Sequence, residues 1–290
     1  MKKLFKHCYL FFLLFLSPNL IASKQKPYVI GNLLGQTGNI FFQIATASAL
    51  AWDNNADPYF PGLAIVPSLY QHYFSHCKIT PPREEISYNW IEPASKYVPI
   101  PYQQNMSLSG YFQSWKYFDH HKERLVALFA PPKKDLKQIE QKYGHLLSQP
   151  NTVGIQIRYY MEEAPSYAQY GRDYLEKTMK LFPETSLFIV SSNNINFAKN
   201  EVPVEGRNVI FLEGDPAYID FYLLTRCKHN IITNSTFGWW AAYLNQNPDK
   251  IIVCPDSWFG QEDSSSNFKE NHPDFYPESW IQIQASRVAP

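Results

Sequence analysis

Small hydroxylated residues stand where a predicted strand meets a predicted helix, in the stretch NIITNSTFGWWAAYLN over residues 230–245. Ser235 and Thr236 come where the apolar run ends and the aromatic-rich segment begins. The first backbone N–H groups of a helix lack partners within the helix, and the helix dipole favours negative charge there. Hydroxyl donors added to such a turn make a phosphate site, although Ser or Thr here can also be an ordinary N-cap. Both interpretations of the turn remain open at this point.

A single arginine, Arg158, closes the apolar run VGIQIR over residues 153–158. The carboxyl ends of strands face the ligand crevice in open α/β sheets. A guanidinium at such an end can hold a diphosphate through two hydrogen bonds and stabilise charge on a departing phosphate. A surface ion pair with Glu162 or Glu163 is the alternative interpretation.

Two further groupings indicate chemistry only weakly. The loop at residues 31–43 carries three glycines between a strand and a helix, but without the GxGxxG spacing of a dinucleotide-binding loop, so an oxidoreductase is a minor hypothesis. His72, His76 and Cys77 lie close in sequence, yet no third ligand with a metal-site spacing follows. The chain also contains no Asp-x-Asp motif, and we expect no metal site.

The residues singled out above need elements that hold them in place, and the C-terminal half has the clearer pattern. Short apolar runs rich in β-branched residues alternate there with helix-like segments, which predicts a mainly parallel sheet with right-handed crossovers. The predicted strands are 153–158, 186–192, 208–213, 230–234 and 251–255, and the predicted helices are 172–181, 194–200, 216–228 and 237–246.

The N-terminal half begins in the same way, with a predicted strand at 28–31 and a helix from Asn39 to Trp52. The proline-rich stretch 54–110 has no readable pattern, and a polar segment that we expect to carry a helix, 131–151, separates the halves. We therefore expect an α/β protein with two Rossmann-like lobes, residues 24–150 and 151–290, and a cleft between them.

The composition is that of a globular protein, with 45% hydrophobic and 18% charged residues. The 26 basic and 26 acidic residues balance, whereas nucleic-acid binding calls for a basic excess. Aromatic residues make up 16% of the chain, a supply that suits sugar-binding surfaces as well as a core. The four cysteines are widely spaced and form no CxxC, so we expect neither a disulfide scaffold nor a zinc site.

The chain starts with MKKLFKHCYLFFLLFLSPNLIAS, residues 1–23. A basic start, a short apolar core and small residues near the end are typical of a signal peptide, and a short membrane anchor is the alternative, with an ordinary buried segment as a third. We expect export, or membrane association through residues 4–21, with the side of the membrane undetermined.

Five segments resemble, in order along the chain, the α-1,2-fucosyltransferase family, glycosyltransferase family 11. They are GNIFFQIA (38–45), GYFQSWKYF (110–118), VGIQIRYY (153–160), LFIVSSNN (187–194) and the longer stretch 220–259. The similarity extends from about residue 28 to residue 259, and NSTFGWWAAYLN is its most specific part.

The resemblance implies a GT-B-like fold and an inverting, metal-independent transfer of L-fucose from GDP-fucose, with no cofactor. It implies the 2-hydroxyl of a galactoside as the usual acceptor, so a galactose-terminated glycan is the expected partner. Residues 24–150 would then form the acceptor-side lobe, and residues 151–290 the lobe that binds GDP-fucose.

The resemblance also implies roles for individual residues, of which Arg158 is the catalytic one. Arg158 is similar to the first arginine of the family's His-x-Arg-Arg motif, which contacts the donor diphosphate. The predicted donor-binding residues are Gln156 at the motif histidine, Asp220 at the guanine edge, and Ser235, Thr236 and Phe237 at the phosphate turn. The predicted cleft-facing residues of the N-terminal lobe are Gly38, Asn39 and Gln43.

The chain departs from that motif at several positions. Gln156 replaces the histidine, Tyr159 replaces the second arginine, and Tyr160-Met161 replaces the usual Gly-Asp pair. Since a charge-assisted hydrogen bond is worth roughly 1.5–3 kcal/mol, one lost contact could slow catalysis by about one or two orders of magnitude. A degenerate relative that binds nucleotide or glycan without turnover is therefore the alternative hypothesis. The sequence identifies no general base.

Overall fold

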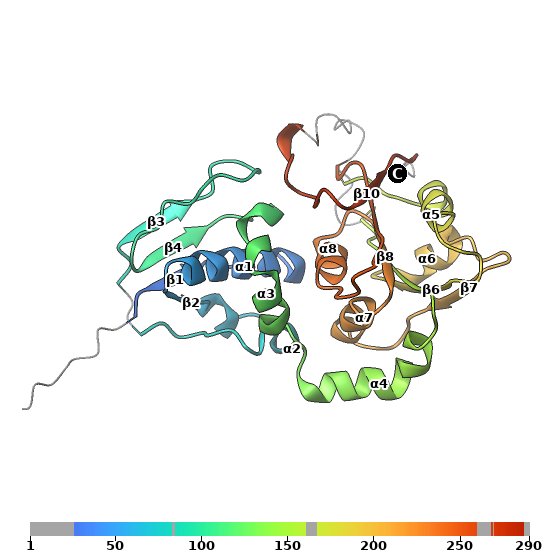
Figure 1. Cartoon of the computed structure of the whole chain (residues 1–290), viewed down its shortest axis with the longest axis horizontal. Coiled ribbons are helices and arrows are strands. Elements are labelled where there is room, and N and C mark those ends of the chain that lie inside the picture. The colour runs from blue at the N-terminus through green and yellow to red at the C-terminus, as the bar shows by residue number, and fades with distance from the viewer. Residues whose placement is uncertain (1–25, 83–84, 161–166, 260–267, 269, 287–290) are drawn as a thin grey trace, which may run out of the picture.

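The computed structural model describes residues 26–82, 85–160, 167–259, 268 and 270–286. Figure 1 shows two α/β lobes, each built on one sheet. The sheet of the N-terminal lobe has the order β2-β1-β4-β3, and its neighbours are all parallel. Its strands are β1 (Tyr28–Gly31), β2 (Asp57–Tyr59), β3 (Tyr88–Ile91) and β4 (Met106–Ser109).

The C-terminal sheet has six parallel strands in the order β10-β9-β8-β5-β6-β7. They are β5 (Thr152–Ile157), β6 (Leu187–Ser192), β7 (Asn208–Phe211), β8 (His229–Ile232), β9 (Ile252–Pro255) and β10 (Ile281–Ile283). The chain fills one side of β5 first and then the other, so the strand order reverses between β5 and β8. In doubly wound sheets a ligand binds beyond the carboxyl ends of the strands at such a reversal.

Helices connect and cover these strands. They are α1 (Thr37–Asp53), α2 (Gln71–Phe74), α3 (Lys122–Leu128), α4 (Lys133–Leu147), α5 (Arg172–Met179), α6 (Ile195–Glu201), α7 (Ala217–Leu224) and α8 (Thr236–Tyr243). Short 3-10 turns lie at Pro61–Ala64, Ser68–Tyr70, Trp115–Tyr117 and Asp119–His121. In Figure 1, α4 runs from one lobe to the other, while α1 and α8 lie against each other at the junction of the lobes.

The two lobes share a hydrophobic core where α1 meets α8. The ring of Phe41 on α1 stacks on Trp240 of α8 and on Phe221 of α7, with centroid distances of 5.3 Å and 5.1 Å. One buried cluster therefore continues from the N-terminal lobe into the C-terminal lobe. A second buried cluster contains the odd-numbered side chains of β5 and packs on α5. Because successive strand residues face opposite sides, β5 is buried on both faces, as a central parallel strand requires.

Most predicted elements are present with shifted ends. The strand predicted at 230–234 ends at Ile232, and the helix predicted at 216–228 ends at Leu224. The stretch 54–110, which gave no readable pattern, contains β2, β3, β4 and α2. Residues 1–23, with the predicted signal peptide or anchor, lie outside the described residues. Within the described ranges, no helix has both the length and the apolar character needed to cross a membrane.

Candidate functional site

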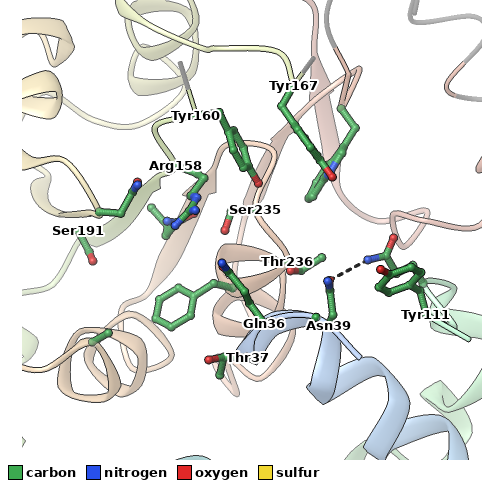
Figure 2. Close-up of a pocket in the computed structure, with 18 of the residues that line it drawn as sticks. Gln36, Thr37, Asn39, Tyr111, Arg158, Tyr160, Tyr167, Ser191, Ser235 and Thr236 are labelled. Carbon is green, nitrogen blue, oxygen red and sulfur yellow. Dashed lines mark hydrogen bonds between the residues drawn. The ribbon is translucent and has the colours of Figure 1, made fainter. Parts of the chain in front are cut away.

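A cavity of about 700 Å³ lies between the lobes, at the carboxyl ends of β5 and β8. The N-terminal lobe contributes residues 35–39, among others, and the C-terminal lobe contributes Arg158 and the turn from Ser235 to Phe237. In Figure 2, Arg158 and Ser235 lie toward the C-terminal lobe, Tyr111 lies on the opposite side, and Asn39 projects from α1 between them. The cavity is where the strand order places a ligand.

Hydrogen bonds fasten the two strand ends that flank the cavity. The backbone N–H of Arg158 donates to Oγ1 of Thr233 (2.9 Å), and the N–H of Thr233 donates to the carbonyl of Gln156 (3.0 Å). The N–H of Ser235 in turn donates to the carbonyl of Thr233 (2.8 Å). Arg158 is also the one arginine or lysine among the described residues that line the cavity. A cationic side chain on a fixed strand end thus lies in the same cavity as the start of α8.

Tyr160 holds the side chain of Arg158 and is itself anchored to the neighbouring turn. The guanidinium carbon of Arg158 lies 5.1 Å from the centre of the Tyr160 ring, within cation–π distance. The Tyr160 hydroxyl donates to the carbonyl of Asn234 (3.0 Å). Tyr159, at the position of the family's second arginine, does not line the cavity, because its ring packs against Phe197 on α6.

Two helices begin at the same cavity. α8 starts after its N-cap Ser235 and α1 starts after its N-cap Gln36, and neither cap side chain accepts a hydrogen bond from its helix among the described residues. No acidic residue lies in the first turn of either helix. Both helix dipoles therefore direct their positive ends, with N–H groups not used within the helix, toward one space. The arrangement favours an anion that reaches both helices.

Close packing of the two helix starts depends on Gly38. A Cβ at Gly38 would lie 2.3 Å from Oγ1 of Thr236 and 2.5 Å from the backbone nitrogen of Phe237. Only glycine allows the first turn of α1 to approach the first turn of α8 this closely. Gly38 thus brings the N-terminal lobe to the predicted phosphate turn.

Asp220 on α7 lies at the edge of the cavity near the end of β6. Its Oδ2 accepts a hydrogen bond from the Ser191 hydroxyl (2.8 Å), while its buried Oδ1 has no hydrogen-bond partner among the described residues. Burial raises the pKa of Asp220 from 3.8 to about 6, the Ser191 hydrogen bond opposes that rise, and nearby Asp215 adds to it. Such an oxygen is ready to accept hydrogen bonds from a ligand.

The remaining predicted residues divide into two groups. Gln156 is buried and lines the cavity, and its Oε1 lacks a hydrogen-bond partner among the described residues. Asn39 also lines the cavity, and its Oδ1 accepts a hydrogen bond from Nε2 of Gln113 (3.0 Å). The prediction that Gln43 faces the cleft is wrong, because Gln43 is buried on α1 and does not belong to the lining. Its amide bonds both the N–H and the carbonyl of Leu34 (2.9 and 3.0 Å), so it supports the glycine loop.

Several lining residues were not predicted from the sequence. Tyr111 and Gln113 belong to the aromatic stretch 110–118, for which packing is the simplest interpretation. Packing is correct for Phe112 and Phe118, which are buried, but residues 111 and 113 face the cavity. Buried and cavity-facing positions alternate over residues 111–113. The sequence shows that this stretch is aromatic, but it does not show which positions face the cavity.

In the described part of the chain, one group of side chains could hold a metal ion. It consists of Asp53, His120 and His121, with their ligand atoms within 4.8 Å of one another. Asp53 is the last residue of α1, about 24 Å along the helix from the cavity at its first turn. His72, from the cluster at residues 72–77, instead bonds Asp135 through Nδ1 (2.6 Å) and stacks on Tyr218.

Comparison with known proteins gives the family. Residues 83–284 match the profile described as "Glycosyl transferase family 11". A galactoside alpha-(1,2)-fucosyltransferase 2 from Oryctolagus cuniculus is 30% identical over 254 residues, which are 79% of this chain and 71% of the relative. An alpha-1,2-colitosyltransferase from Escherichia coli is 28% identical over 204 residues, covering 67% of this chain and 68% of the relative.

The fold is confirmed by a solved structure. The crystal structure of the fucosyltransferase NodZ from Bradyrhizobium superposes with a TM-score of 0.50 at 12% identity, over 75% of this chain and 92% of that one. The predicted GT-B-like fold of two Rossmann-like lobes is therefore correct. With the profile match over most of its length and the relatives named above, the chain belongs to glycosyltransferase family 11 and is an enzyme of that family.

Proposed function

We propose that this enzyme transfers L-fucose from GDP-fucose to the 2-hydroxyl of a galactoside, with inversion and without a metal ion. The galactoside fucosyltransferases among its relatives support this choice of sugar and acceptor. The observation that carries the proposal is the convergence of Arg158 and two helix starts on one cavity between the lobes. That arrangement suits a diphosphate better than a neutral ligand.

The diphosphate of the donor would lie between Arg158 and the first turns of α8 and α1. The guanidinium can hold two phosphate oxygens at once, and the backbone N–H groups of Thr236 and Phe237 can take another. Since these donors are fixed by the fold, they can stabilise the negative charge that develops on the leaving GDP. They would do so without a divalent cation, which supports the proposal that the reaction needs no metal ion.

The guanine base would lie at Asp220. A guanine edge offers two adjacent N–H donors, and the ionised carboxylate has the free acceptor capacity to bond them. Ser191 fixes the orientation of the carboxylate through Oδ2 and leaves Oδ1 for the base. Adenine lacks this pair of donors, so Asp220 would select GDP-sugars over ADP-sugars.

The reaction follows from this placement. As the bond between the fucose anomeric carbon and the phosphate oxygen breaks, its electron pair stays with GDP, and the sugar gains oxocarbenium character. The 2-hydroxyl oxygen of the acceptor forms the new bond from the opposite face, and its proton is released to water. Arg158 and the two helix starts lower the barrier because they bind the departing diphosphate more strongly as its charge grows.

The test is transfer of labelled fucose from GDP-fucose to lactose, with the linkage assigned by NMR and the reaction run with and without EDTA. Arg158→Ala should lower kcat/KM by at least about tenfold, the loss of one charge-assisted contact. Arg172→Ala is the matched control, because Arg172 is an exposed residue of α5 that does not line the cavity. Equal product from wild type and Arg158→Ala would remove Arg158 from the mechanism.

Two further comparisons separate this proposal from its rivals. Since one relative is named a colitosyltransferase, GDP-colitose should be offered beside GDP-fucose, and a faster reaction with it would change the donor assigned here. Calorimetry with GDP distinguishes an enzyme from a binding protein. Tight binding of GDP without transfer or donor hydrolysis would support the non-catalytic alternative.

A further inference from the structure

A second cavity, of about 400 Å³, adjoins the first and shares Ser95 and Tyr111 with it. Its lining comes entirely from the N-terminal lobe: Leu34, the segment Ile91–Ser95, and the segment Ser109–Tyr111. Tyr111 therefore stands at the boundary between the two cavities. In Figure 2 it lies across the pocket from Arg158 and Ser191.

Tyr111 is a large aromatic side chain that remains 49% exposed although its backbone is firmly held. One carboxylate oxygen, Oε2 of Glu92, accepts hydrogen bonds from the N–H groups of Tyr111 (2.8 Å) and Phe112 (3.0 Å). This half-buried glutamate, which follows β3, thus holds the backbone of the two residues at positions 111 and 112, which follow β4. The backbone from which the Tyr111 ring projects is therefore held before any ligand arrives.

The residue after Tyr111 adopts an unfavourable backbone conformation. Phe112 has φ of 52°, a left-handed conformation that costs about 1–3 kcal/mol for such a side chain. Burial compensates for this cost, because the Phe112 ring is almost fully buried, stacks on Trp90 (5.9 Å) and meets Tyr117 edge-on (5.7 Å). Strain of this kind persists where the surroundings enforce it, often at ligand sites. Here its effect is to bury residue 112 and display residue 111.

We infer that Tyr111 is the stacking platform for the acceptor sugar next to the donor, and that the second cavity takes the following sugar unit. The inference rests on the proposed function. One face of a galactose ring presents C–H groups and packs well on an aromatic ring, while its hydroxyls remain available to water or polar side chains. The platform lies opposite the cation and the phosphate turn, so an acceptor stacked there faces the donor.

The second cavity has the mixed chemistry that a sugar requires. Ile91 and Leu34 are exposed apolar side chains, 66% and 48% accessible, at its edge. Ser95 and Ser109 supply hydroxyl groups in the same lining. An acceptor of two or more sugar units can use this cavity, whereas a single galactose cannot reach it. The enzyme should therefore prefer a galactose-terminated disaccharide over a simple alkyl galactoside.

The experiment compares lactose with methyl β-galactoside as acceptors for wild type, Tyr111→Ala and Tyr111→Phe. Tyr111→Ala should raise the KM for both acceptors by about tenfold, equal to about 1.4 kcal/mol, while the KM for GDP-fucose stays within about twofold. Tyr111→Phe keeps the ring and should recover most of that loss. Tyr97→Ala, at an exposed tyrosine of the same lobe outside both cavities, is the matched control.

A second variant tests the second cavity alone. Ala94→Trp places a large side chain in that cavity, so it should abolish the preference for lactose and leave the KM for methyl β-galactoside unchanged. If Tyr111→Ala leaves both acceptor KM values unchanged, or raises the KM for GDP-fucose equally, the platform is refuted. If Ala94→Trp changes the KM values for lactose and methyl β-galactoside by the same factor, or changes neither, the second sugar site is refuted.

Binding measurements keep this inference separate from the proposed reaction. Saturation-transfer NMR on the protein with GDP should show contact with the galactose protons of lactose in wild type, and a loss of that contact in Tyr111→Ala. Lactose binding without fucose transfer would contradict the proposed reaction but support the platform. Fucose transfer with no difference in lactose contact between wild type and Tyr111→Ala would support the proposed reaction but contradict the platform.

Discussion

The backbone N–H of Arg158 donates a hydrogen bond to the hydroxyl of Thr233, with 2.9 Å between the nitrogen and Oγ1. Thr233 is fully buried, and the bond joins the ends of β5 and β8, between which the strand order reverses. The backbone of Arg158 and the start of α8 are therefore kept at a fixed separation before a donor binds. Preorganisation of this kind is what makes charge stabilisation effective in a transition state.

Replacing that hydroxyl should affect both stability and catalysis. Thr233→Val keeps the shape of the side chain but leaves the Arg158 N–H without its acceptor, which costs about 1–3 kcal/mol. We expect Tm to fall by about 2–4 °C per kcal/mol and kcat/KM for GDP-fucose to fall as well. Thr225→Val is the control, since its hydroxyl bonds only the Tyr222 carbonyl at the end of α7. A lower Tm with unchanged kcat/KM would limit Thr233 to a structural role.

Tyr160 should matter through its ring and through its hydroxyl separately. Tyr160→Leu removes the cation–π contact with Arg158, worth about 0.5–2 kcal/mol, so kcat/KM should fall by about two- to thirtyfold. Tyr160→Phe keeps the ring and removes only the hydrogen bond to the Asn234 carbonyl, so its loss should be smaller. Steady-state kinetics with both variants checks this order. If Tyr160→Phe is the more damaging change, the hydroxyl rather than the ring positions Arg158.

The sequence predicts the donor side of the site because its signals are local. Arg158 ends one apolar run and Ser235 follows another, so the sequence alone places each of them at the end of a strand. In the structure the two residues share one cavity, although their roles in catalysis are still predictions. The strand order that brings them together depends on pairing between distant segments, for which periodicity in the sequence gives only a general rule.

The acceptor side could not be predicted for two physical reasons. Short strands such as β2 and β3 carry proline or exposed residues and therefore lack the pattern of a buried strand. The direction of Tyr111 depends on a positive φ at Phe112, which nothing in the residue type of phenylalanine suggests. Gln43 shows the opposite error. The resemblance to the family implied that it faces the cleft, whereas its side chain bonds the backbone of Leu34.

The binding of GDP-fucose should depend on pH through Asp220. Its pKa is raised to about 6 by burial, while a guanine edge requires the ionised carboxylate. The affinity should therefore be constant above about pH 7 and weaken below pH 6 by up to about tenfold per pH unit. GDP-fucose is preferable to GDP in this calorimetry, because a terminal phosphate itself titrates near pH 6. Asp220→Asn should bind weakly and with little pH dependence.

The raised pKa of Asp220 also affects the stability of the ligand-free protein, and this effect has the opposite dependence on pH. The folded pKa of Asp220 lies above its ordinary value of 3.8, so the folded state holds this proton more tightly than the unfolded state. The contribution of Asp220 to stability is therefore full below about pH 4 and is lost as the pH rises through about 6. The free energy of unfolding of wild type and Asp220→Asn should be compared between about pH 4 and pH 6. A rise with pH in wild type relative to the variant would contradict the raised pKa of Asp220.

Gly38→Ala should damage the protein although alanine is the better helix former. The new Cβ would lie 2.3 Å from Oγ1 of Thr236 and 2.5 Å from backbone atoms of residues 236 and 237, so α1 and α8 must move apart. Overpacking of this kind costs about 1–3 kcal/mol, and the gain in helix propensity of about 1 kcal/mol does not offset it. Thermal melting should show a lower Tm, and GDP-fucose should bind more weakly because the two helix starts no longer meet the same anion.

Gly144→Ala on α4 provides the matched control for Gly38→Ala. There the nearest atom to a new Cβ is Oε1 of Glu140, at 2.7 Å, and that flexible carboxylate can rotate away. Alanine at position 144 should therefore be neutral or stabilising by up to about 1 kcal/mol, with no change in donor affinity. If Gly38→Ala behaves like Gly144→Ala in both measurements, the close approach of α1 to α8 is not what shapes the diphosphate site, and Arg158 with α8 alone must bind the anion.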